Sequence, residues 1–169
     1  MKIHEVISYF YKNSSRISGH LEVNSGNPGP KTIIFGGTHG NEPSGVKAIV
    51  KAHQLLTANP DLIASGQIHF ILGNPEAFIQ NLRFIDQDLN RVFHQPKGNS
   101  VEALRAREII KLFEVIGPID SILDLHTVSK GDYQIMIYDD EQKNALENAD
   151  KFSDIDMHLI YNKKHIHGL

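Results

Sequence analysis

The chain of 169 residues contains no cysteine. Disulfide bonds and thiolate chemistry are therefore excluded, and any metal site must draw on histidine and carboxylate ligands. Residues 1–5 lack the apolar core of a signal peptide, and no apolar run is long enough to cross a bilayer. These absences predict a cytoplasmic protein that does not enter the membrane.

An excess of positive charge is also absent. The formal net charge is -3 and the sequence holds no long basic run, so nothing favours a nucleic acid or an anionic membrane as partner. Hydrophobic residues make up 40% of the chain and charged residues 22%, which is typical of a globular protein rather than a disordered one. The length fits one domain.

Strand and helix patterns alternate along the chain. Apolar runs predict strands, and an apolar stripe with a helical period predicts helices that begin at Pro43 and after Ser100. The predicted strands cover residues 32–37, 67–72, 119–125 and 133–138, and a polar surface helix is predicted over 140–152. This order predicts an α/β fold of three layers, with helices flanking a mostly parallel or mixed central sheet.

Two segments lack a clean period. Residues 74–99 contain glycine, proline and many polar groups, so we interpret them as an irregular functional excursion from the sheet. Within the first 30 residues the sequence favours a hairpin around residues 18–23 and a turn at residues 26–29.

A histidine and a glutamate follow the first strong strand, in Gly36-Gly37-Thr38-His39-Gly40-Asn41-Glu42-Pro43. His-x-x-Glu is a spacing at which two side chains can bind one metal ion, and the flanking glycines leave room for an ion. His126 ends another strand, and in parallel sheets such sites gather at the carboxyl ends of strands. The sequence therefore predicts a metal site made of His39, Glu42 and His126. The alternative is a polar turn whose glutamate caps a helix.

A second group of charged residues lies in residues 83–91. Asn90 and Arg91 together suit a carboxylate, because a guanidinium fork and an amide can both donate to it. Arg83 is a fixed positive charge that can stabilise an oxyanion, and Asp88 can accept the second N–H of a metal-bound histidine. The alternative is a solvated loop with surface ion pairs.

These motifs, taken in order, resemble the succinylglutamate desuccinylase/aspartoacylase family, a branch of the zinc carboxypeptidases. The resemblance covers residues from about 32 to 138, and it rests on four segments in the right order: residues 37–42, Asn74-Pro75-Glu76-Ala77, Arg83 with Asp88-Leu89-Asn90-Arg91, and Asp124-Leu125-His126. It implies a zinc-carboxypeptidase-like fold.

The resemblance also implies a role for each site residue. His39, Glu42 and His126 would bind one zinc ion, and Arg83 would polarise the scissile carbonyl. The other three implied residues are Asn90 and Arg91, which would bind the carboxylate of the substrate, and Asp88, which would orient His39. The implied activity is zinc-dependent hydrolysis of a non-peptide amide bond, which releases an acyl group such as succinate or acetate from a small N-acyl amino acid.

One departure from the family concerns the general base. The family's base is a glutamate well downstream of the second histidine, which by analogy lies beyond Leu169; Glu141 and Glu147 are too close to His126. A β-rich C-terminal domain also has no counterpart. We therefore expect residues 1–169 to form a single zinc-hydrolase-like domain that is incomplete at its C-terminus and a poor catalyst alone. His165 and His167 are expected to be exposed tail residues.

Two other functions fit the same residues. A carboxypeptidase-like peptidase would use the same zinc ligands on a peptide, but Asp-Leu-Asn-Arg and Asp-Leu-His are closer to the acylase branch. A non-catalytic module would keep the zinc and the carboxylate-binding residues and bind acyl amino acids without turnover.

Overall fold

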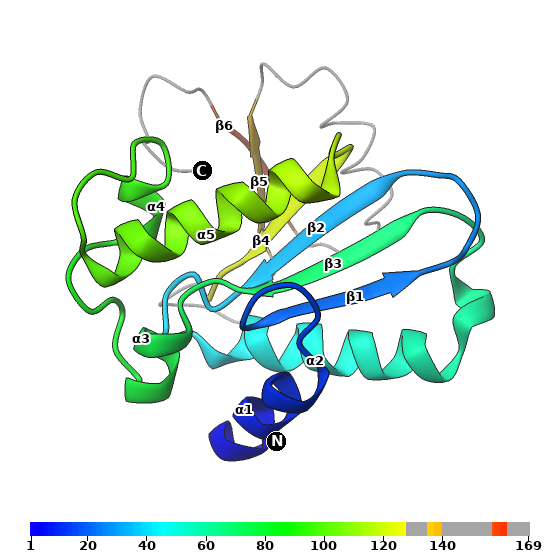
Figure 1. Ribbon diagram of the computed structural model, residues 1–169, viewed down its shortest axis with the longest axis horizontal. Coiled ribbons are helices and arrows are strands. Elements are labelled where there is room, and N and C mark those ends of the chain that lie inside the picture. The colour runs from blue at the N-terminus through cyan, green and yellow to red at the C-terminus, as the bar shows by residue number, and fades with distance from the viewer. Residues whose placement is uncertain (128–134, 140–156, 162–169) are drawn as a thin grey trace. The chain divides into compact units, whose positions relative to one another are not determined.

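The computed structural model describes residues 1–127, 135–139 and 157–161 (Figure 1). The chain divides into two compact units, Met1–Thr127 and Val128–Leu169. In the second unit, β5 (Ile135–Asp139) pairs in parallel with β6 (Met157–Tyr161). This confirms a strand close to the predicted range 133–138. All the predicted site residues lie in the first unit.

A four-stranded sheet forms the centre of the first unit. Its strands are β1 (His20–Asn24), β2 (Lys31–Gly36), β3 (Gln67–Leu72) and β4 (Ser121–Leu125), in the order β1-β3-β2-β4. The pairs β2–β3 and β2–β4 are parallel, whereas β1 pairs with β3 in the antiparallel sense. The prediction of a mixed sheet is therefore confirmed.

Helices cover both faces of this sheet (Figure 1). They are α1 (Ile3–Asn13), α2 (Pro43–Ala58), α3 (Pro75–Gln80), α4 (Leu89–Val92) and α5 (Val101–Ile116), with a short 3-10 helix η1 (Pro60–Leu62) after α2. Pro43 occupies the first turn of α2, where its missing N–H costs nothing. At α5, the Ser100 hydroxyl accepts the Ala103 N–H at 3.1 Å, and Gly117 ends the helix with φ +84°.

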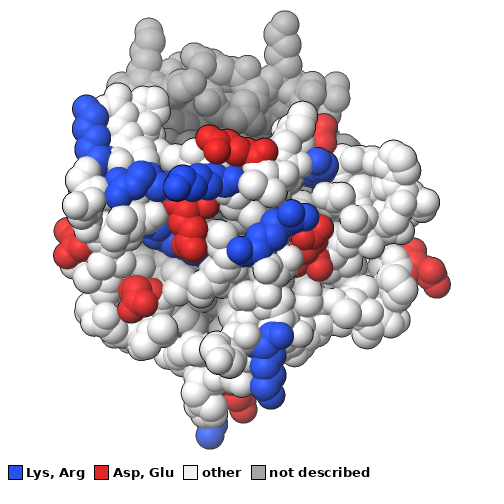
Figure 2. All heavy atoms as spheres, in the orientation of Figure 1, with Lys and Arg blue, Asp and Glu red and all other residues white. Residues whose placement is uncertain are grey.

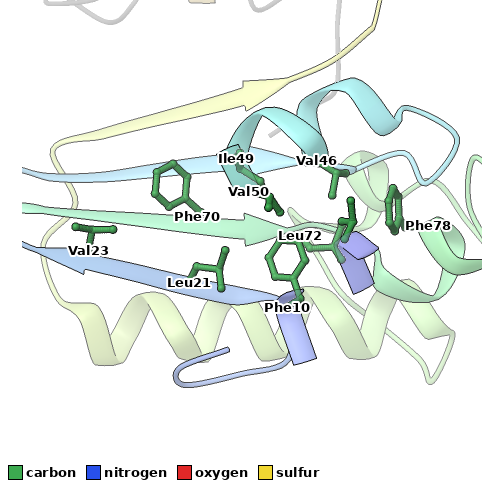
Figure 3. Packing of buried hydrophobic residues seen from close by; sticks show 10 residues of the cluster. Phe10, Leu21, Val23, Val46, Ile49, Val50, Phe70, Leu72 and Phe78 are labelled. Carbon is green, nitrogen blue, oxygen red and sulfur yellow. The ribbon is translucent and has the colours of Figure 1, made fainter. Parts of the chain in front are cut away.

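The hydrophobic core has two parts, one on each face of the sheet. On the face of α1 and α2, Figure 3 shows Phe10, Leu21 and Phe70 packed with the buried side of α2. On the opposite face, Ile33 and Phe35 pack against α5. Because side chains alternate along a strand, each central strand supplies residues to both parts. These packed layers confirm the predicted three-layer α/β architecture.

The N-terminal segment differs from the prediction. Residues 3–13 form α1, whose Val6 and Phe10 are buried against the sheet, and no hairpin forms around residues 18–23. Instead β1 pairs with β3, a strand more than 40 residues away. The hairpin prediction was wrong because a local sequence cannot reveal a distant strand partner.

The segment 74–99 is also more regular than predicted. It contains α3 and α4, two helices of 6 and 4 residues that are too short to produce a period. The sequence did hold a signal for α3, because Asn74 caps it by accepting the Ala77 N–H at 3.2 Å and Pro75 follows in the first turn.

Several predictions fall outside the described residues. These are the polar helix over 140–152, with Glu141 and Glu147, and the tail residues His165 and His167.

Among the helices that the structure describes, none has both the length and the hydropathy that a membrane crossing requires. On the face drawn in Figure 2, acidic and basic side chains lie next to one another rather than in separate patches.

A buried histidine pair links β1 to β3. The Nε2 of His20 lies 3.1 Å from the Nδ1 of His69, with the rings nearly parallel at 16°. The Arg16 N–H faces His20 Nδ1 at 3.4 Å and Gln67 Oε1 faces His69 Nε2 at 3.2 Å, so one chain of donors satisfies two neutral rings. Glu22 also lies close enough for the three side chains to surround a cation, but the nitrogen-to-nitrogen contact favours a hydrogen bond.

This pair predicts a loss of stability in acid. Burial, followed by repulsion from His69, lowers the pKa of His20 from 6.5 to about 4. The unfolded chain therefore takes up this proton first, and the stabilisation present above pH 6.5 is lost as the pH falls towards 4. We expect titration of His20 to lower the free energy of unfolding by roughly 3 kcal/mol as the solution is acidified. Urea denaturation at a series of pH values measures this decrease.

Two variants control this measurement. His20→Gln should flatten the pH dependence between 7 and 4, whereas His94→Gln, at an exposed position, should leave it unchanged. Equal pH slopes for His20→Gln and the wild-type chain would show that His20 does not titrate in this way.

Candidate metal centre

The register of β2 and β4 places the two predicted histidines side by side. Gly36, the last residue of β2, pairs with Leu125, the last residue of β4. His39 follows three residues after Gly36, and His126 follows directly after Leu125. The two imidazole centroids are 4.9 Å apart. Both histidines therefore lie at the carboxyl edge of the sheet, where parallel sheets place their sites.

The glycines around His39 allow the loop to pack closely. Gly37 has φ +71°, and a side chain there would meet Val46. A Cβ on Gly40 would lie 2.1 Å from the backbone carbon of Ala77. The structure thus assigns these glycines to contacts with α2 and α3, a reason different from the room for an ion that the sequence suggested.

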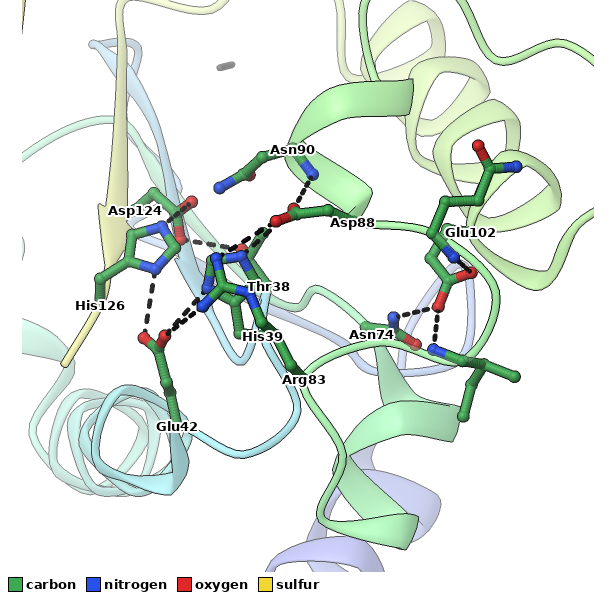
Figure 4. A network of polar contacts seen from close by, with 12 residues as sticks. Thr38, His39, Glu42, Asn74, Arg83, Asp88, Asn90, Glu102, Asp124 and His126 are labelled. Atoms are coloured by element: carbon green, nitrogen blue, oxygen red, sulfur yellow. Dashed lines mark hydrogen bonds and ion pairs between the residues drawn. The ribbon is translucent and has the colours of Figure 1, made fainter. Parts of the chain in front are cut away.

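The Glu42 carboxylate lies between the two histidines. Its Oε1 is 2.9 Å from His39 Nδ1, and its Oε2 is 3.2 Å from His126 Nδ1 (Figure 4). The Thr127 N–H donates to the same Oε2 at 2.7 Å and fixes the carboxylate. The three predicted ligands therefore converge through the Nδ1 atoms of both rings.

The opposite nitrogen of each ring faces a second carboxylate. His39 Nε2 lies 3.2 Å from Asp88 Oδ1, and His126 Nε2 lies 2.8 Å from Asp124 Oδ2 (Figure 4). A carboxylate in this position fixes the orientation of an imidazole and makes its other nitrogen a better metal ligand.

The charges of the centre favour a bound cation. All four nitrogens of His39 and His126 face carboxylate oxygens, but a neutral imidazole has only one N–H to donate. The hydrogen bond to Asp124 is the main reason that the pKa of His126 is raised. A divalent cation carries the same charge as the two Nδ1 protons and can replace them.

The geometry of the three ligands suits such an ion. Among the described residues, His39, Glu42 and His126 present ligand atoms that all lie within 4.8 Å of one another. The side chains of His39 and Glu42 are 5% and 12% exposed, whereas that of His126 is 35% exposed. The set can therefore hold a metal, and His126 is the most exposed of its three residues.

Arg83 lies beside the predicted ligands. Its guanidinium donates to Asp88 Oδ2 at 3.2 Å and lies 3.8 Å from Glu42 Oε1, and half of the side chain is exposed. Burial raises the pKa of Asp88, but the charge of His39 and the hydrogen bonds from His39 and Arg83 outweigh it and lower the pKa. Asp88 is therefore an ionised link between Arg83 and His39.

Asn90 and Arg91 follow Asp88 in the short helix α4. The Asn90 N–H donates to Asp88 Oδ1 at 3.1 Å. The side-chain oxygen of Asn90 is buried and accepts no hydrogen bond from the described residues. Arg91 is exposed. An unpaired buried acceptor is costly, so this oxygen is an exception to the usual pairing of buried polar atoms.

The sequence alone predicts no role for Asp124 or Thr38. Asp124 lies on β4 two residues before His126, which follows the strand, and Thr38 Oγ1 donates to Asp124 Oδ1 at 2.9 Å. The signal for Asp124 was present, because side chains two positions apart along a strand point to the same face. Only the contact between β2 and β4 reveals the role of Thr38.

Comparison with known sequences agrees with the motifs. The family model of the succinylglutamate desuccinylase/aspartoacylase catalytic domain matches residues 28–166. The succinylglutamate desuccinylase of Pseudomonas paraeruginosa is 35% identical over 109 residues, which are 61% of this chain and 32% of that protein. A probable aspartoacylase of Prochlorococcus marinus subsp. pastoris is 38% identical over 103 residues, or 59% of this chain and 34% of that protein. The chain thus spans about a third of the length of these curated relatives.

Solved structures share the fold. A succinylglutamate desuccinylase from Chromobacterium violaceum has a TM-score of 0.70 at 19% identity, over 91% of this chain and 54% of that one. A metallo-carboxypeptidase from Burkholderia cenocepacia has a TM-score of 0.67 at 15% identity, over 98% and 54%. The predicted carboxypeptidase-like fold is confirmed. Since the family model covers most of the sequence, the chain belongs to the succinylglutamate desuccinylase/aspartoacylase family.

Proposed function

We propose that the protein is a zinc-dependent amide hydrolase that releases an acyl group, such as succinate or acetate, from a small N-acyl amino acid. The observation that carries this proposal is the convergence of His39, Glu42 and His126, with a carboxylate behind each histidine. The names of the relatives, succinylglutamate desuccinylase and probable aspartoacylase, support the substrate class.

Zinc is the proposed metal because the ligand set is two imidazoles and one carboxylate. Catalytic zinc sites commonly have three protein ligands of these types and keep one position open. Bound there, zinc would supply Lewis acidity, which lowers the pKa of water and polarises a carbonyl. The substrate is proposed to approach from the side of His126, whose side chain is 35% exposed.

Arg83 is proposed to stabilise the developing negative charge on the scissile carbonyl oxygen. Its guanidinium lies within 3.8 Å of Glu42, and Asp88 holds it from the other side. Because half of the side chain is exposed, N–H donors are available to a molecule that enters the site. A positioned donor at this place stabilises the substrate most strongly when the oxyanion forms.

Asn90 and Arg91 are proposed to bind the amino-acid part of the substrate. The exposed guanidinium of Arg91 and the side-chain NH₂ group of Asn90 can donate to a carboxylate. We assign none of the described residues to the proton transfer that completes the reaction.

The direct test is to measure product release by the zinc-loaded, full-length protein. Free glutamate from N-succinylglutamate, or free aspartate from N-acetylaspartate, should appear with the wild type and not with His39→Ala. Saturable binding of these compounds without release would identify a binding module instead. Release of the last residue of a peptide, but not of an acyl group, would identify a peptidase.

We expect the purified chain to bind about one zinc ion, because three ligands of suitable type converge. His39→Ala and His126→Ala should each abolish stoichiometric zinc in elemental analysis. His94→Ala removes an exposed histidine and should keep the full zinc content. Full zinc content in both ligand variants would show that the metal lies elsewhere.

The carboxylates behind the histidines should tune the zinc affinity. Asp88→Asn and Asp124→Asn should each weaken zinc binding by roughly 10–100-fold in a competitive titration, the usual effect of losing such a partner. The control is Asp61→Asn, which removes an exposed carboxylate after α2 and should bind zinc as the wild type does. Wild-type affinity in Asp88→Asn and Asp124→Asn would remove these carboxylates from the site.

The two arginines should differ in steady-state kinetics of the active enzyme. Lysine keeps the charge but loses the planar fork. Arg91→Lys should mainly raise KM, because a bound carboxylate is held equally in the ground state and the transition state. Arg83→Lys should mainly lower kcat, because its contact strengthens as the oxyanion forms. The reverse pattern would exchange the two roles. No kinetic effect in either variant would indicate that both arginines are solvated surface residues without a role in the reaction.

A further inference from the structure

Glu102 is a buried carboxylate that lies outside the proposed metal centre. It occupies the first turn of α5 and is 0% exposed. A charge in such a position needs hydrogen bonds to offset its lost hydration. The N-terminus of α5 contributes through its dipole, which favours an acidic group in the first turn.

Four N–H groups from outside α5 surround this carboxylate. Its Oε1 accepts the backbone N–H of Ile85 at 2.7 Å and the side-chain N–H of Asn74 at 2.9 Å (Figure 4). Its Oε2 accepts the backbone N–H groups of Asp86 and Gln87 at 3.1 and 3.2 Å. Burial raises the pKa of Glu102, but these bonds outweigh it and lower the pKa. The carboxylate is therefore ionised and fully used as an acceptor.

The three backbone donors belong to one loop, residues 83–88. This loop begins at Arg83 and ends at Asp88. Two further bonds hold the loop to the start of α5. Asp86 Oδ2 accepts the Val101 N–H at 2.8 Å, and Gln87 donates to Ser100 Oγ at 2.6 Å. At the upstream end, the Arg83 carbonyl accepts the Gly40 N–H, next to His39, at 3.2 Å.

We propose that Glu102 is a positioning residue of the metal centre. It fixes the backbone of residues 85–87, and this backbone sets where Asp88 meets His39 Nε2 and where Arg83 meets Glu42. The proposal rests on the proposed function, because it gives Asp88 and Arg83 their roles there. Glu102 touches neither metal nor substrate and acts through the loop alone.

The hydrogen-bond pattern explains why glutamine cannot replace this glutamate. A glutamine offers one oxygen and one NH₂ group, so in either orientation two of the four donors face another donor. Rotating the Asn74 amide gives no relief, because Asn74 Oδ1 caps α3 through the Ala77 N–H. Glu102→Gln keeps the shape of the side chain but removes half of the acceptors.

Amide hydrogen exchange tests the contact itself. In the wild-type chain the N–H groups of Ile85, Asp86 and Gln87 should be protected. In Glu102→Gln the N–H of Ile85, or those of Asp86 and Gln87, should exchange about tenfold faster or more, depending on which way the amide turns. Glu114→Gln is the matched control, since Glu114 is exposed on the same helix. Unchanged protection in Glu102→Gln would overturn the proposal.

Zinc titration then tests the coupling to the centre. Glu102→Gln should lower zinc affinity by about 10-fold or more, as expected when the carboxylate behind a ligand is misplaced. Combined with Asp88→Asn, it should add little, because both changes disturb the same contact. A folded Glu102→Gln chain with wild-type affinity, or effects of the two substitutions that simply add, would contradict a positioning role.

Two features keep this test independent of the proposed function. If the wild-type chain binds no zinc, the proposed function fails and the positioning role fails with it, whereas the exchange data still report whether Glu102 holds the loop. If Glu102→Gln does not fold, Asn74→Ser keeps a capping hydroxyl for α3 and removes one bond to Glu102. It should speed exchange at Ile85 and weaken zinc binding; wild-type values for both would overturn the proposal.

Discussion

The parallel pairing of β2 with β4 is the interaction on which the candidate centre depends. It places Gly36 opposite Leu125, so the residues that follow each strand emerge at the same edge of the sheet. A shift of this register by one residue would turn the side chains of β4 to the opposite face, and Asp124 with it. The apolar residues that fix the register, such as Ile33 and Phe35 against α5, therefore also fix the distance between the histidines.

Charge compensation is the second constraint on the centre. Glu42, Asp88 and Asp124 lie around two imidazoles, and Arg83 is a permanent cation beside Glu42 and Asp88. A group of carboxylates this close is stable only with positive charge between them. The protein satisfies this with imidazole N–H groups, and the same arrangement suits a divalent ion. The electrostatics that position the histidines are thus the electrostatics that favour a metal.

Helix α5 fastens the segments around the centre through two buried charges one turn apart. Arg105 donates to the carbonyl groups of Leu72 and Gly73 at the end of β3, at 2.7 and 2.9 Å. Glu102 accepts from the loop that leads to Asp88. Both charges form hydrogen bonds with backbone groups, and Arg105 also pairs with Glu108. These bonds satisfy backbone polar atoms that a loop would otherwise leave unpaired in the interior. The helix therefore orders irregular backbone that has no strand or helix of its own.

The sequence alone determined the α/β class, the main strands and helices and the residues that converge, because these depend on local periodicity and on motif chemistry. Its period identified α2 and α5, and the strand ends identified His39 and His126. Tertiary structure decided the rest. The partner of β1, the Nδ1 orientation of both imidazoles and the role of Asp124 depend on contacts between distant segments. Glu102 is the clearest case: in the sequence it stands one place too early for a capping box, and only the folded chain brings the 85–87 backbone to it, because hydrogen-bond partners far apart in sequence leave no periodic trace.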